Sequence, residues 1–303
     1  MARILIVGSN SFVGQKIAYM LHGKGEKDVF LCSSSENRLN HLAYPFSNVD
    51  ITKREELRRL FLKVRPDIVF NTAAIASPDV CVMNKELALL VNVDGARNIA
   101  ELSTLYGAHL VHFSTDFVFN GCKPYLTEED APDPVNYYGF TKWESEKVVN
   151  AYADSYAIVR TVSVYGFLAT LTRSNFILRV KAALEAGKEY RVPNDQFRTP
   201  TLVEDLANIS IKIGIEGHSG LFHIAGQEGL TNYEFAIQAA SVFCLDPQLI
   251  IPVSSFEMDE KAVRPLNTGF DISKARTILG YSPTTLLDGL MLVKSQIDKH
   301  IIC

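Results

Sequence analysis

Short runs of consecutive apolar residues alternate with helical patterns through the first half of the chain. The runs lie at residues 4–7, 29–32, 68–71, 110–113 and 157–160. Because apolar and polar positions do not alternate within them, they are typical of strands that helices cover on both faces. Helical periodicity marks the segments between them, at residues 12–21, 52–64, 86–105 and 138–152. This order predicts an α/β fold with a Rossmann-type, doubly wound parallel sheet, which binds its ligand at the carboxyl ends of the strands.

Two Thr-x-x-Glu sequences, at 52–55 and 231–234, have the form of capping boxes. In a capping box the threonine and glutamate side chains satisfy backbone N–H groups at the start of a helix. We therefore expect helices over residues 52–64 and 231–243.

The pattern changes after residue 165, where longer loops rich in Pro, Gly, Asn and Thr separate fewer helices. Further helices are expected at 175–186 and 286–300, and no low-complexity linker divides the chain. We expect a dinucleotide-binding domain at residues 1–165, on which residues 195–215 pack back. Residues 166–303 are expected to form a smaller C-terminal α/β substrate-binding lobe.

Composition narrows the choice of partners. A hydrophobic content of 47% against 21% charged residues is typical of a globular protein. The formal net charge is −4 and there is no dense Lys/Arg run, which argues against nucleic acid or an anionic membrane surface as a partner. The apolar run at 4–7 is too short for a signal peptide, and no segment approaches a membrane span, so we expect a cytoplasmic protein.

The five cysteines form neither a C-x-x-C pair nor a group with histidine at metal-ligand spacing. We expect reduced thiols and no metal site. The cysteines are Cys32, Cys81, Cys122, Cys244 and Cys303.

The first candidate motif is the segment 7–14, which follows the first expected strand and begins the first helix. Gly8 permits a tight turn, and Gly14 permits the helix to pack close to the sheet. Free amides at the helix N-terminus can bind a pyrophosphate. Taken alone, the segment also fits an ordinary turn between a strand and a helix.

The second candidate motif is Tyr138-Gly139-Phe140-Thr141-Lys142, at the start of an expected helix. Tyr138 and Lys142 are four residues apart and so lie on one helical face. Reduction of a ketone needs a proton for the developing alkoxide, and a neighbouring ammonium lowers the pKa of a phenol toward neutral pH. Tyr138 is therefore a candidate general acid, unless the two residues form an ordinary surface pair.

The third candidate motif, Ser114-Thr115-Asp116, follows the strand expected at 110–113. A hydroxyl at the end of that strand can hydrogen-bond the substrate oxygen and align it with the phenol. Asp116 can orient Thr115, contact substrate or cap a turn. The order of the three motifs favours a reductase over three unrelated turns.

Taken together, these motifs resemble the extended short-chain dehydrogenase/reductase superfamily and, within it, the dTDP-4-dehydrorhamnose reductases. The family's Ser-Thr-Asp-x-Val-Phe stands at 114–119, and its Tyr-Gly-x-Thr-Lys at 138–142. Its Asp-Gln-x-x-x-Pro-Thr stands at 195–201, and its Arg-Pro-x-Asn at 264–267. The similarity runs from Arg3 to about residue 289 in consistent order.

The resemblance implies a role for each matching residue. The implied catalytic set is Thr115, Tyr138 and Lys142. The implied cofactor contacts are Gly8, Ser11, Phe12, Val13, Gly14, Ser33, Arg38, Asp50, Ile51, Asn71, Ala73, Ala74, Tyr138 and Lys142. The implied substrate contacts are Asp116, Asn175, Gln196 and Arg264, of which Arg264 is the natural diphosphate clamp because a guanidinium suits phosphate oxygens.

Three departures from the family pattern concern the ligands. Ser11 replaces the middle glycine of the family's Gly-x-x-Gly-x-x-Gly, and residues 76–82 differ from its Thr-x-Val-Asp-x-x-Glu. In the stretch 160–165, Ser163 stands where the family often has Trp. The wall that faces the sugar therefore differs from the family's.

The end of the second strand bears on the choice of cofactor. Residues 33–38 read Ser-Ser-Ser-Glu-Asn-Arg, and three hydroxyls with Arg38 can accept a 2′-phosphate. NADP(H) is therefore preferred, and Glu36 keeps NAD(H) as an alternative.

These observations predict an NADP(H)-dependent reductase of a nucleotide-activated keto-sugar, with a homodimer as an open option for its assembly. One alternative is a sugar-nucleotide epimerase or dehydratase of the same superfamily, which returns the hydride. Another is a non-catalytic regulatory subunit resembling that of methionine adenosyltransferase.

Overall fold

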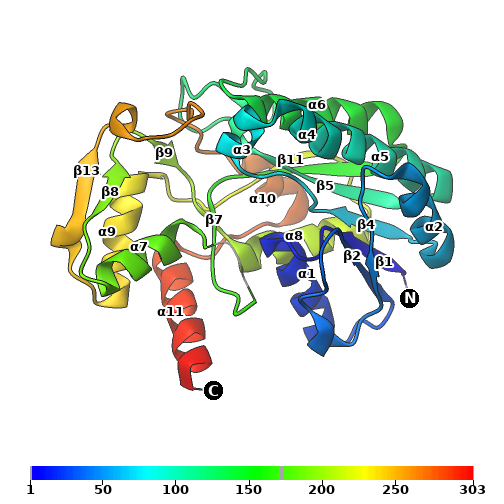
Figure 1. Cartoon of the computed structure of the whole chain (residues 1–303), viewed down its shortest axis with the longest axis horizontal. Coiled ribbons are helices and arrows are strands. Elements are labelled where there is room, and N and C mark those ends of the chain that lie inside the picture. Colours follow the sequence, from blue (N-terminus) through cyan, green and yellow to red (C-terminus); the bar gives the residue numbers. More distant parts are fainter. Residues whose placement is uncertain (1, 171–173, 303) are drawn as a thin grey trace.

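A parallel sheet of seven strands forms the centre of the computed structural model, which describes residues 2–170 and 174–302 (Figure 1). The strand order is β11-β6-β5-β4-β1-β2-β3, and every neighbouring pair is parallel. The order reverses between β1 and β4, so the carboxyl ends of these two strands flank a crevice. The strands are β1 (Ile4–Val7), β2 (Val29–Ser33), β3 (Phe46–Asn48), β4 (Ile68–Asn71), β5 (His109–Thr115), β6 (Tyr156–Thr161) and β11 (Gly220–Ile224).

All five strands expected from the apolar runs are confirmed, whereas β3 and β11 were not expected. β3 reads Phe-Ser-Asn, with no residue fully buried, and β11 lies far along the chain at the opposite edge. Neither strand is a continuous apolar run. Both lie at the edges of the sheet, where the backbone of the neighbouring strand supplies hydrogen-bond partners. A short segment without a continuous apolar run can therefore form a strand there.

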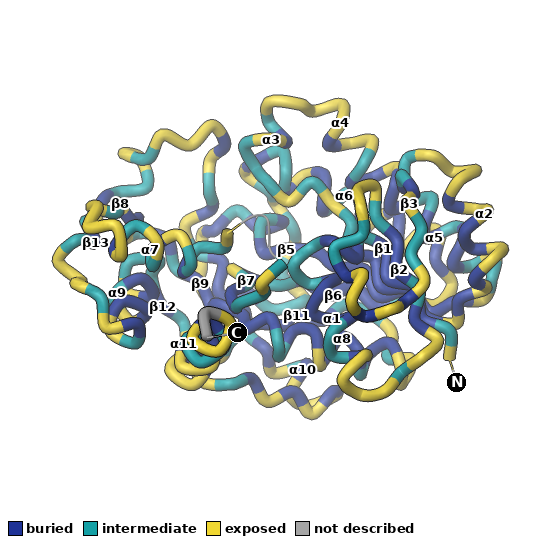
Figure 2. Tube along the Cα trace, turned by 60° about the horizontal axis from the view of Figure 1, so that its bottom comes forward, coloured by how far each residue is buried: buried dark blue, intermediate teal, exposed yellow. Residues whose placement is uncertain are grey.

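Helices cover both faces of the sheet, as the unbroken apolar runs require. Ile4 and Ile6 of β1 belong to one buried cluster with residues of α1 (Phe12–Gly23), α8 (Val203–Glu216) and α10 (Ser273–Leu279). Leu5 and Val7 belong to a second cluster with residues of α2 (Arg54–Val64), α5 (Gly95–Tyr106) and α6 (Tyr137–Tyr152). Figure 2 shows the strands as a buried layer, with the exposed segments mostly at helices and loops around it.

One capping box is confirmed and the other is wrong. Thr231 Oγ1 accepts from Glu234 N at 3.1 Å, and Glu234 Oε2 accepts from Thr231 N at 2.7 Å, at the start of α9 (Asn232–Phe243). Thr52, by contrast, lies outside α2, whose N-cap residue Lys53 makes no side-chain cap bond. The Asp50 side chain accepts from Thr52 N at 2.9 Å, and this local turn delays the helix by two residues.

The helix expected over 86–105 is interrupted. It consists of α4 (Lys85–Leu89), a π-helical turn (Leu90–Asp94) and α5, and α3 (Pro78–Met83) precedes it. The wider turn aims Asn92 at the loop after β4, where its Oδ1 accepts from Ile75 N at 2.8 Å. Its Nδ2 donates to Thr141 Oγ1 of α6 at 3.0 Å. Asn92 thus joins a strand-end loop to the helix that carries Tyr138 and Lys142.

The second half of the chain builds a smaller lobe beside the sheet and also returns to the sheet. α8 lies against α1 and β5, and β11 extends the sheet beside β6. The lobe, at the left of Figure 1, has its own buried core from α7 (Phe176–Glu185), α9 and α11 (Leu286–Ile302). Its short strands are β7 (Val164–Tyr165), β8 (Tyr190–Pro193), β9 (Phe197–Arg198), β10 (Thr201–Leu202), β12 (Leu230–Thr231) and β13 (Ile250–Val253).

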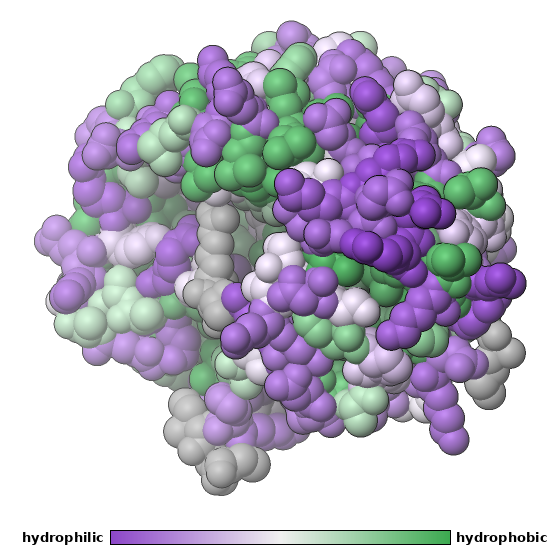
Figure 3. Space-filling model, turned by 45° about the vertical axis from the view of Figure 1, so that its right-hand side comes forward, coloured by the Kyte–Doolittle hydropathy of each residue, from purple (hydrophilic) through white to green (hydrophobic). Residues whose placement is uncertain are grey.

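Figure 3 shows the side of the molecule on which α2 and the first strands lie. Hydrophilic residues cover most of this side, and hydrophobic residues gather in smaller areas. Among the described residues, no helix has both the length and the apolar character needed to cross a membrane. Cys32 and Cys81 are buried free thiols, Cys122 and Cys244 are exposed free thiols, and Cys303 lies outside the described residues.

Candidate active site

A cavity of about 710 Å³ lies between the carboxyl edge of the sheet and the second lobe. Many of the residues expected to bind cofactor or substrate line it together. They are Ser11, Phe12, Val13, Arg38, Ala74, Thr115, Asp116, Tyr138, Lys142, Asn175, Gln196 and Arg264. The other expected cofactor residues lie outside its lining, in the first turn of α1 for Gly14 and at or just after strand ends for the rest: Gly8, Ser33, Asp50, Ile51, Asn71 and Ala73.

The loop after β1 is closely packed against the end of β4. Gly8 has φ +78°, and a Cβ on it would lie 2.6 Å from Ala73 N. A Cβ on Gly14 would lie 2.6 Å from Gly8 O. Both positions therefore need glycine, as the sequence motif indicates.

Ser11, which replaces a glycine of the family pattern, is used inside this loop. Its Oγ accepts from Gly14 N at 3.0 Å and donates to Thr72 Oγ1 at 2.9 Å. Ser11 is thus the N-cap of α1, and its hydroxyl already has two partners. With serine at this position, the loop is held by hydrogen bonds to Gly14 and Thr72.

Asn10 connects this loop to the segment after β2. Its Nδ2 donates to Ser35 Oγ at 2.8 Å and to Glu36 O at 2.7 Å, and its Oδ1 accepts from Arg38 N at 3.2 Å. These bonds hold the backbone of Arg38 at the cavity wall. The hydroxyl-rich segment 33–38 therefore lies beside the loop at the N-terminus of α1.

α6 carries Tyr138 and Lys142 into the cavity. Asn136 is its N-cap, with Oδ1 accepting from Gly139 N at 2.9 Å. The first turn packs closely on the turn Asp116–Val118, because a Cβ on Gly139 would lie 1.9 Å from Phe117 O. The Phe117 and Tyr138 rings meet edge to face at 5.8 Å. Glycine at this position brings the helix against the strand end that bears Thr115.

Lys142 is almost wholly buried, and its surroundings oppose its charge. Burial lowers its pKa from 10.5 to about 8, while Glu146 and Cys81 act in the opposite direction. Its Nζ lies 3.3 Å from His112 Nε2. A pKa near 8 lets this lysine change its protonation state close to neutral pH.

Thr115 and Asp116 form one hydrogen-bonded unit at the end of β5. Thr115 Oγ1 donates to Asp116 Oδ1 at 3.0 Å and accepts from Phe117 N at 3.2 Å. Asp116 also accepts from Thr268 and lies 3.7 Å from Arg198 Nε. Burial raises the pKa of Asp116, against the effect of Arg198. Of the three roles left open by the sequence, orienting Thr115 is the one these contacts support.

A buried polar chain runs behind this strand end. Ser114 donates to Glu146 of α6, which also accepts from Arg160 Nε at 2.9 Å and Nη2 at 2.6 Å. Arg160 Nη1 lies 3.4 Å from His223 Nε2 on β11. The chain ties α6 to β6 and β11, so the helix with Tyr138 is fixed by charged contacts as well as by packing.

The expected substrate residues of the second lobe differ in how many of their polar atoms already have a hydrogen-bond partner within the protein. Asn175 is the N-cap of α7, and its Nδ2 donates to Gly166 O at 2.7 Å. Gln196 Oε1 accepts from Asn232 Nδ2 at 2.9 Å, but its buried Nε2 has no hydrogen-bond partner among the described residues. A buried donor without a partner is costly, and in a cavity wall it is a candidate contact for a ligand.

Arg264, the expected diphosphate clamp, is held by its own surroundings. Its Nη2 donates to Asp79 Oδ2 at 2.9 Å, and its Nε lies 3.5 Å from Glu260 Oε1. Asp79 also accepts from Ala262 N at 3.0 Å. The segment that carries Arg264 is thereby fastened to α3 at the cavity mouth.

Sequence reasoning missed several residues of the cavity wall. The spacing of residues along the chain gave no signal for them, because they come from α7, the start of α9, the short strands of the lobe and the loop at 258–264. Only Arg198 stood within a motif that had been recognised, at 195–201. The missed residues include Arg179, Tyr190, Arg191, Arg198, Asn232 and Glu260.

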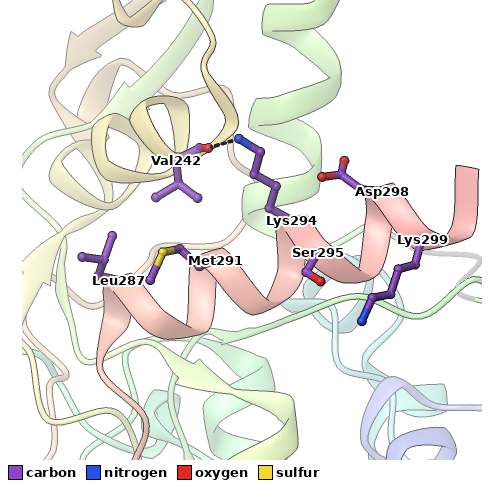
Figure 4. A pocket seen from close by; sticks show the side chains of 7 residues that line it. All are labelled: Val242, Leu287, Met291, Lys294, Ser295, Asp298 and Lys299. Atoms are coloured by element: carbon purple, nitrogen blue, oxygen red, sulfur yellow. Dashed lines mark hydrogen bonds between the residues drawn. The ribbon is translucent and has the colours of Figure 1, made fainter.

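A second hollow of about 440 Å³ lies between α9 and α11 (Figure 4). There Lys294 Nζ donates to Val242 O at 2.8 Å. None of the expected site residues lines this second hollow. Among residues 2–170 and 174–302, no group of three or more His, Cys, Asp or Glu side chains could hold a metal ion.

Comparison with known proteins relates this architecture to sugar-nucleotide enzymes. The family model described as the RmlD substrate binding domain matches residues 2–297. A dTDP-4-dehydrorhamnose reductase from Bacillus anthracis, crystallised in complex with NADP, superposes with a TM-score of 0.87 at 29% identity, over 97% of this chain and 99% of that one.

Two curated relatives point to different kinds of protein. The probable low-salt glycan biosynthesis reductase Agl14 of Haloferax volcanii is 30% identical over 297 residues, covering 97% of this chain and 98% of that protein. Methionine adenosyltransferase 2 subunit beta of Rattus norvegicus is 29% identical over 281 residues, covering 91% of this chain and 82% of that protein.

Proposed function

The chain belongs to the family of the RmlD substrate binding domain, and from this membership we propose that it is an NADP(H)-dependent reductase of a nucleotide-activated keto-sugar, similar to dTDP-4-dehydrorhamnose reductase. The observation that carries the proposal is that Thr115, Tyr138 and Lys142 line one cavity, together with the loop at the N-terminus of α1. The neighbour from Bacillus anthracis, crystallised with NADP, supports the same choice.

The cofactor is expected at the sheet edge, where this chain has the features a dinucleotide needs. Gly8 and Gly14 allow close backbone approach to the start of α1, whose N-terminus favours a pyrophosphate. Asp50 and Ile51 are proposed to border the adenine, and Asn71 to Ala74 to line the cofactor beyond β4. Ser33 and Arg38 favour the 2′-phosphate of NADP(H), and NAD(H) is the alternative. Bound there, the nicotinamide supplies the hydride.

The protein's own groups handle the proton and the orientation. Tyr138 donates its phenolic proton to the oxygen of the sugar carbonyl as the hydride arrives at the carbon. Thr115 Oγ1 is held in place by Phe117 N, and its hydroxyl hydrogen, which points to Asp116 in the free protein, turns to the same oxygen when substrate binds. Lys142 in its ammonium form favours the phenolate and so makes Tyr138 a stronger acid.

The nucleotide and sugar are assigned to the wall from the second lobe. Gln196 offers a buried donor without a partner among the described residues, Asn175 lies on the same wall, and Asp116 faces the same cavity from the end of β5. Arg264 serves as the diphosphate clamp only after its contacts with Asp79 and Glu260 change. The division at residue 165 then has a functional meaning, because the cofactor lies on one side and the substrate on the other.

The decisive experiment is turnover of a panel of nucleotide-sugar ketones with NADPH and NADH, followed by loss of reduced-cofactor absorbance. Tyr138→Phe should abolish turnover and retain cofactor binding. Tyr137→Phe is the matched control, because Tyr137 precedes it on α6 but lies outside the cavity lining. Equal turnover of Tyr138→Phe and wild type would refute the assignment. An epimerase or dehydratase would show product without net NADPH consumption.

A second candidate function is a non-catalytic regulatory subunit, which the similarity to methionine adenosyltransferase 2 subunit beta favours. The complete set of Thr115, Tyr138 and Lys142 supports the enzyme over this candidate. Copurification with a partner enzyme, together with no oxidation of NADPH by any ketone of the panel, would reverse the order. Sedimentation of the purified protein would test the predicted homodimer option.

A further inference from the structure

His112 lies on β5 directly against Lys142, and the mechanism above gives it no role. Its side chain is buried, with 1% exposure. Nδ1 lies 3.0 Å from Asn71 Nδ2, and Nε2 lies 3.1 Å from Ser145 Oγ and 3.3 Å from Lys142 Nζ. One imidazole therefore contacts the end of β4 and two residues of α6.

The neighbouring bonds determine which ring nitrogen carries the proton. Asn71 Oδ1 accepts from Ala73 N at 3.2 Å, so its NH₂ group faces His112 Nδ1, which must accept. The proton then lies on Nε2. Ser145 donates to Lys142 O at 2.6 Å, so its oxygen accepts from the His112 Nε2–H. Donors and acceptors run in one direction from the Ala73 amide to the Lys142 carbonyl.

The charge of the ring is also settled by its position. Burial holds the pKa of His112 well below its ordinary value, and the nearby Lys142 acts in the same direction, so the ring is neutral. Three titratable groups face Lys142 from the elements packed on it: His112 of β5, Cys81 of α3 and Glu146 of α6. Glu146 favours the ammonium, whereas His112 Nε2, whose hydrogen is donated to Ser145 Oγ, lies 3.3 Å from Nζ as a second donor and disfavours it.

We propose that His112 is a positioning residue: its hydrogen-bond chain holds Lys142 at a fixed place in the cavity wall, and its Nε2–H, which donates to Ser145 Oγ, is close enough to Nζ to be shared with the amine that remains when Lys142 gives up a proton. The proposal rests on the proposed function. In the reduction, the phenolic proton of Tyr138 goes to the alkoxide oxygen, which leaves a phenolate. The Lys142 ammonium supplies the proton that restores the phenol. The resulting amine then shares the Nε2–H with Ser145 Oγ until solvent returns a proton to it.

His112→Phe tests this role, because it keeps a ring of similar size and removes both nitrogens. The Lys142 ammonium should lose an unfavourable dipole and the amine should lose a donor, so the pKa of Lys142 should rise by about 0.5–1 pH unit. NMR titration of isotope-labelled lysine measures this without substrate. The pH profile of kcat should shift in the same direction, with little change in KM.

His109→Phe is the matched control. His109 lies on the same strand and its ring contacts Ser155, away from Lys142, so the Lys142 titration should stay unchanged. A folded His112→Phe protein with an unaltered Lys142 titration would overturn the proposal, even if the protein reduces a keto-sugar.

If His112→Phe fails to fold, the wild-type protein still gives an answer. NMR of ¹⁵N-labelled histidine should show His112 as a neutral ring protonated on Nε2 across pH 6–8. A proton on Nδ1, or a charged ring, would overturn the proposal. Because neither titration needs turnover, a protein inactive on every ketone would contradict the proposed function alone.

Discussion

The two walls of the cavity differ in how far their polar groups are already satisfied. On the strand side, Ser11 and Thr115 each have two hydrogen-bond partners within the fold, as has His112, which is buried behind this wall. On the lobe side, the buried Gln196 Nε2 has no partner among the described residues. Arg264, meanwhile, is held by the carboxylates of Asp79 and Glu260.

This difference in hydrogen bonding between the two walls suits two different tasks, the chemical step and the recognition of the ligand. Groups that must act on a transition state work best when they are already oriented, because no reorganisation is needed during the reaction. Groups that bind a variable nucleotide and sugar have to exchange internal contacts for ligand contacts. In the function proposed above, the strand side serves the chemistry and the lobe side serves recognition. The predictions below test that contrast, from the largest expected effect to the smallest.

Lys142→Met should have the largest effect, since it removes the cation beside Tyr138 from the strand side. We expect kcat to fall by roughly 10²- to 10⁴-fold, the range that a proton-transfer group contributes. Steady-state kinetics with the best ketone of the panel measures it. Lys147→Met, on the exposed side of the same helix and paired with Glu144, should keep wild-type kcat. A similar loss in both variants would mean that helix stability, not the cavity, is responsible.

The same Lys142→Met variant should reveal the cost of burying the ammonium. The pKa of Lys142 falls from 10.5 to about 8 on folding, mainly through burial. Between pH 8 and 10.5 the unfolded chain binds the extra proton, so the wild-type free energy of unfolding should rise with pH across that window. The cost is fully present below pH 8 and amounts to about 3 kcal/mol. Urea unfolding of both proteins at pH 7 and 10 tests this, and a pH-independent difference between them would contradict it.

Gly139→Ala should damage the strand side through geometry alone. A Cβ at this position would lie 1.9 Å from the Phe117 carbonyl oxygen, a backbone atom that cannot move away cheaply. α6 must then shift relative to Thr115, and we expect kcat to fall roughly 10- to 100-fold. Gly23→Ala is the control, because nothing lies within 4 Å of its Cβ position. Unchanged kcat in Gly139→Ala would show that the close approach of α6 is not needed.

Glu260→Gln should have the smallest effect and the opposite sign. It removes a carboxylate that competes with phosphate for Arg264, so a nucleoside diphosphate such as dTDP or UDP should bind roughly two- to fivefold more tightly. Calorimetry with the nucleotide alone measures this. Asp259→Asn changes the neighbouring charge, which lies outside the cavity lining, and should leave affinity unchanged. Weaker binding to Glu260→Gln would place this residue among the ligand contacts.

Much of the strand side could be predicted because its signals are local. The need for glycine at positions 8 and 14 follows from one turn between a strand and a helix. The placement of Tyr138 and Lys142 on one helical face follows from their four-residue spacing. Continuous apolar runs identified five buried strands, since only strands covered on both faces have that pattern. The failed prediction at Thr52 was also local, because the Asp50 side chain provided a competing turn that the capping-box pattern does not weigh.

The lobe side, by contrast, depends on contacts between distant parts of the chain. Arg264 meets Asp79, 185 residues away, and Gln196 meets Asn232, 36 residues away. No rule based on the spacing of residues along the chain predicts such pairs. The same holds for His112, which a sequence shows only as one residue of a buried strand.

By itself, the amino-acid sequence identified the five central strands of the parallel sheet, and its resemblance to a family singled out the three candidate catalytic residues. The strands follow from short-range periodicity, and the placement of Tyr138 and Lys142 on one helical face follows from their spacing. The tertiary structure alone decided which polar groups find partners and which remain available to a ligand. Hydrogen bonds and ion pairs depend on the approach of atoms within a few ångströms, and folding brings those atoms together from separate parts of the chain.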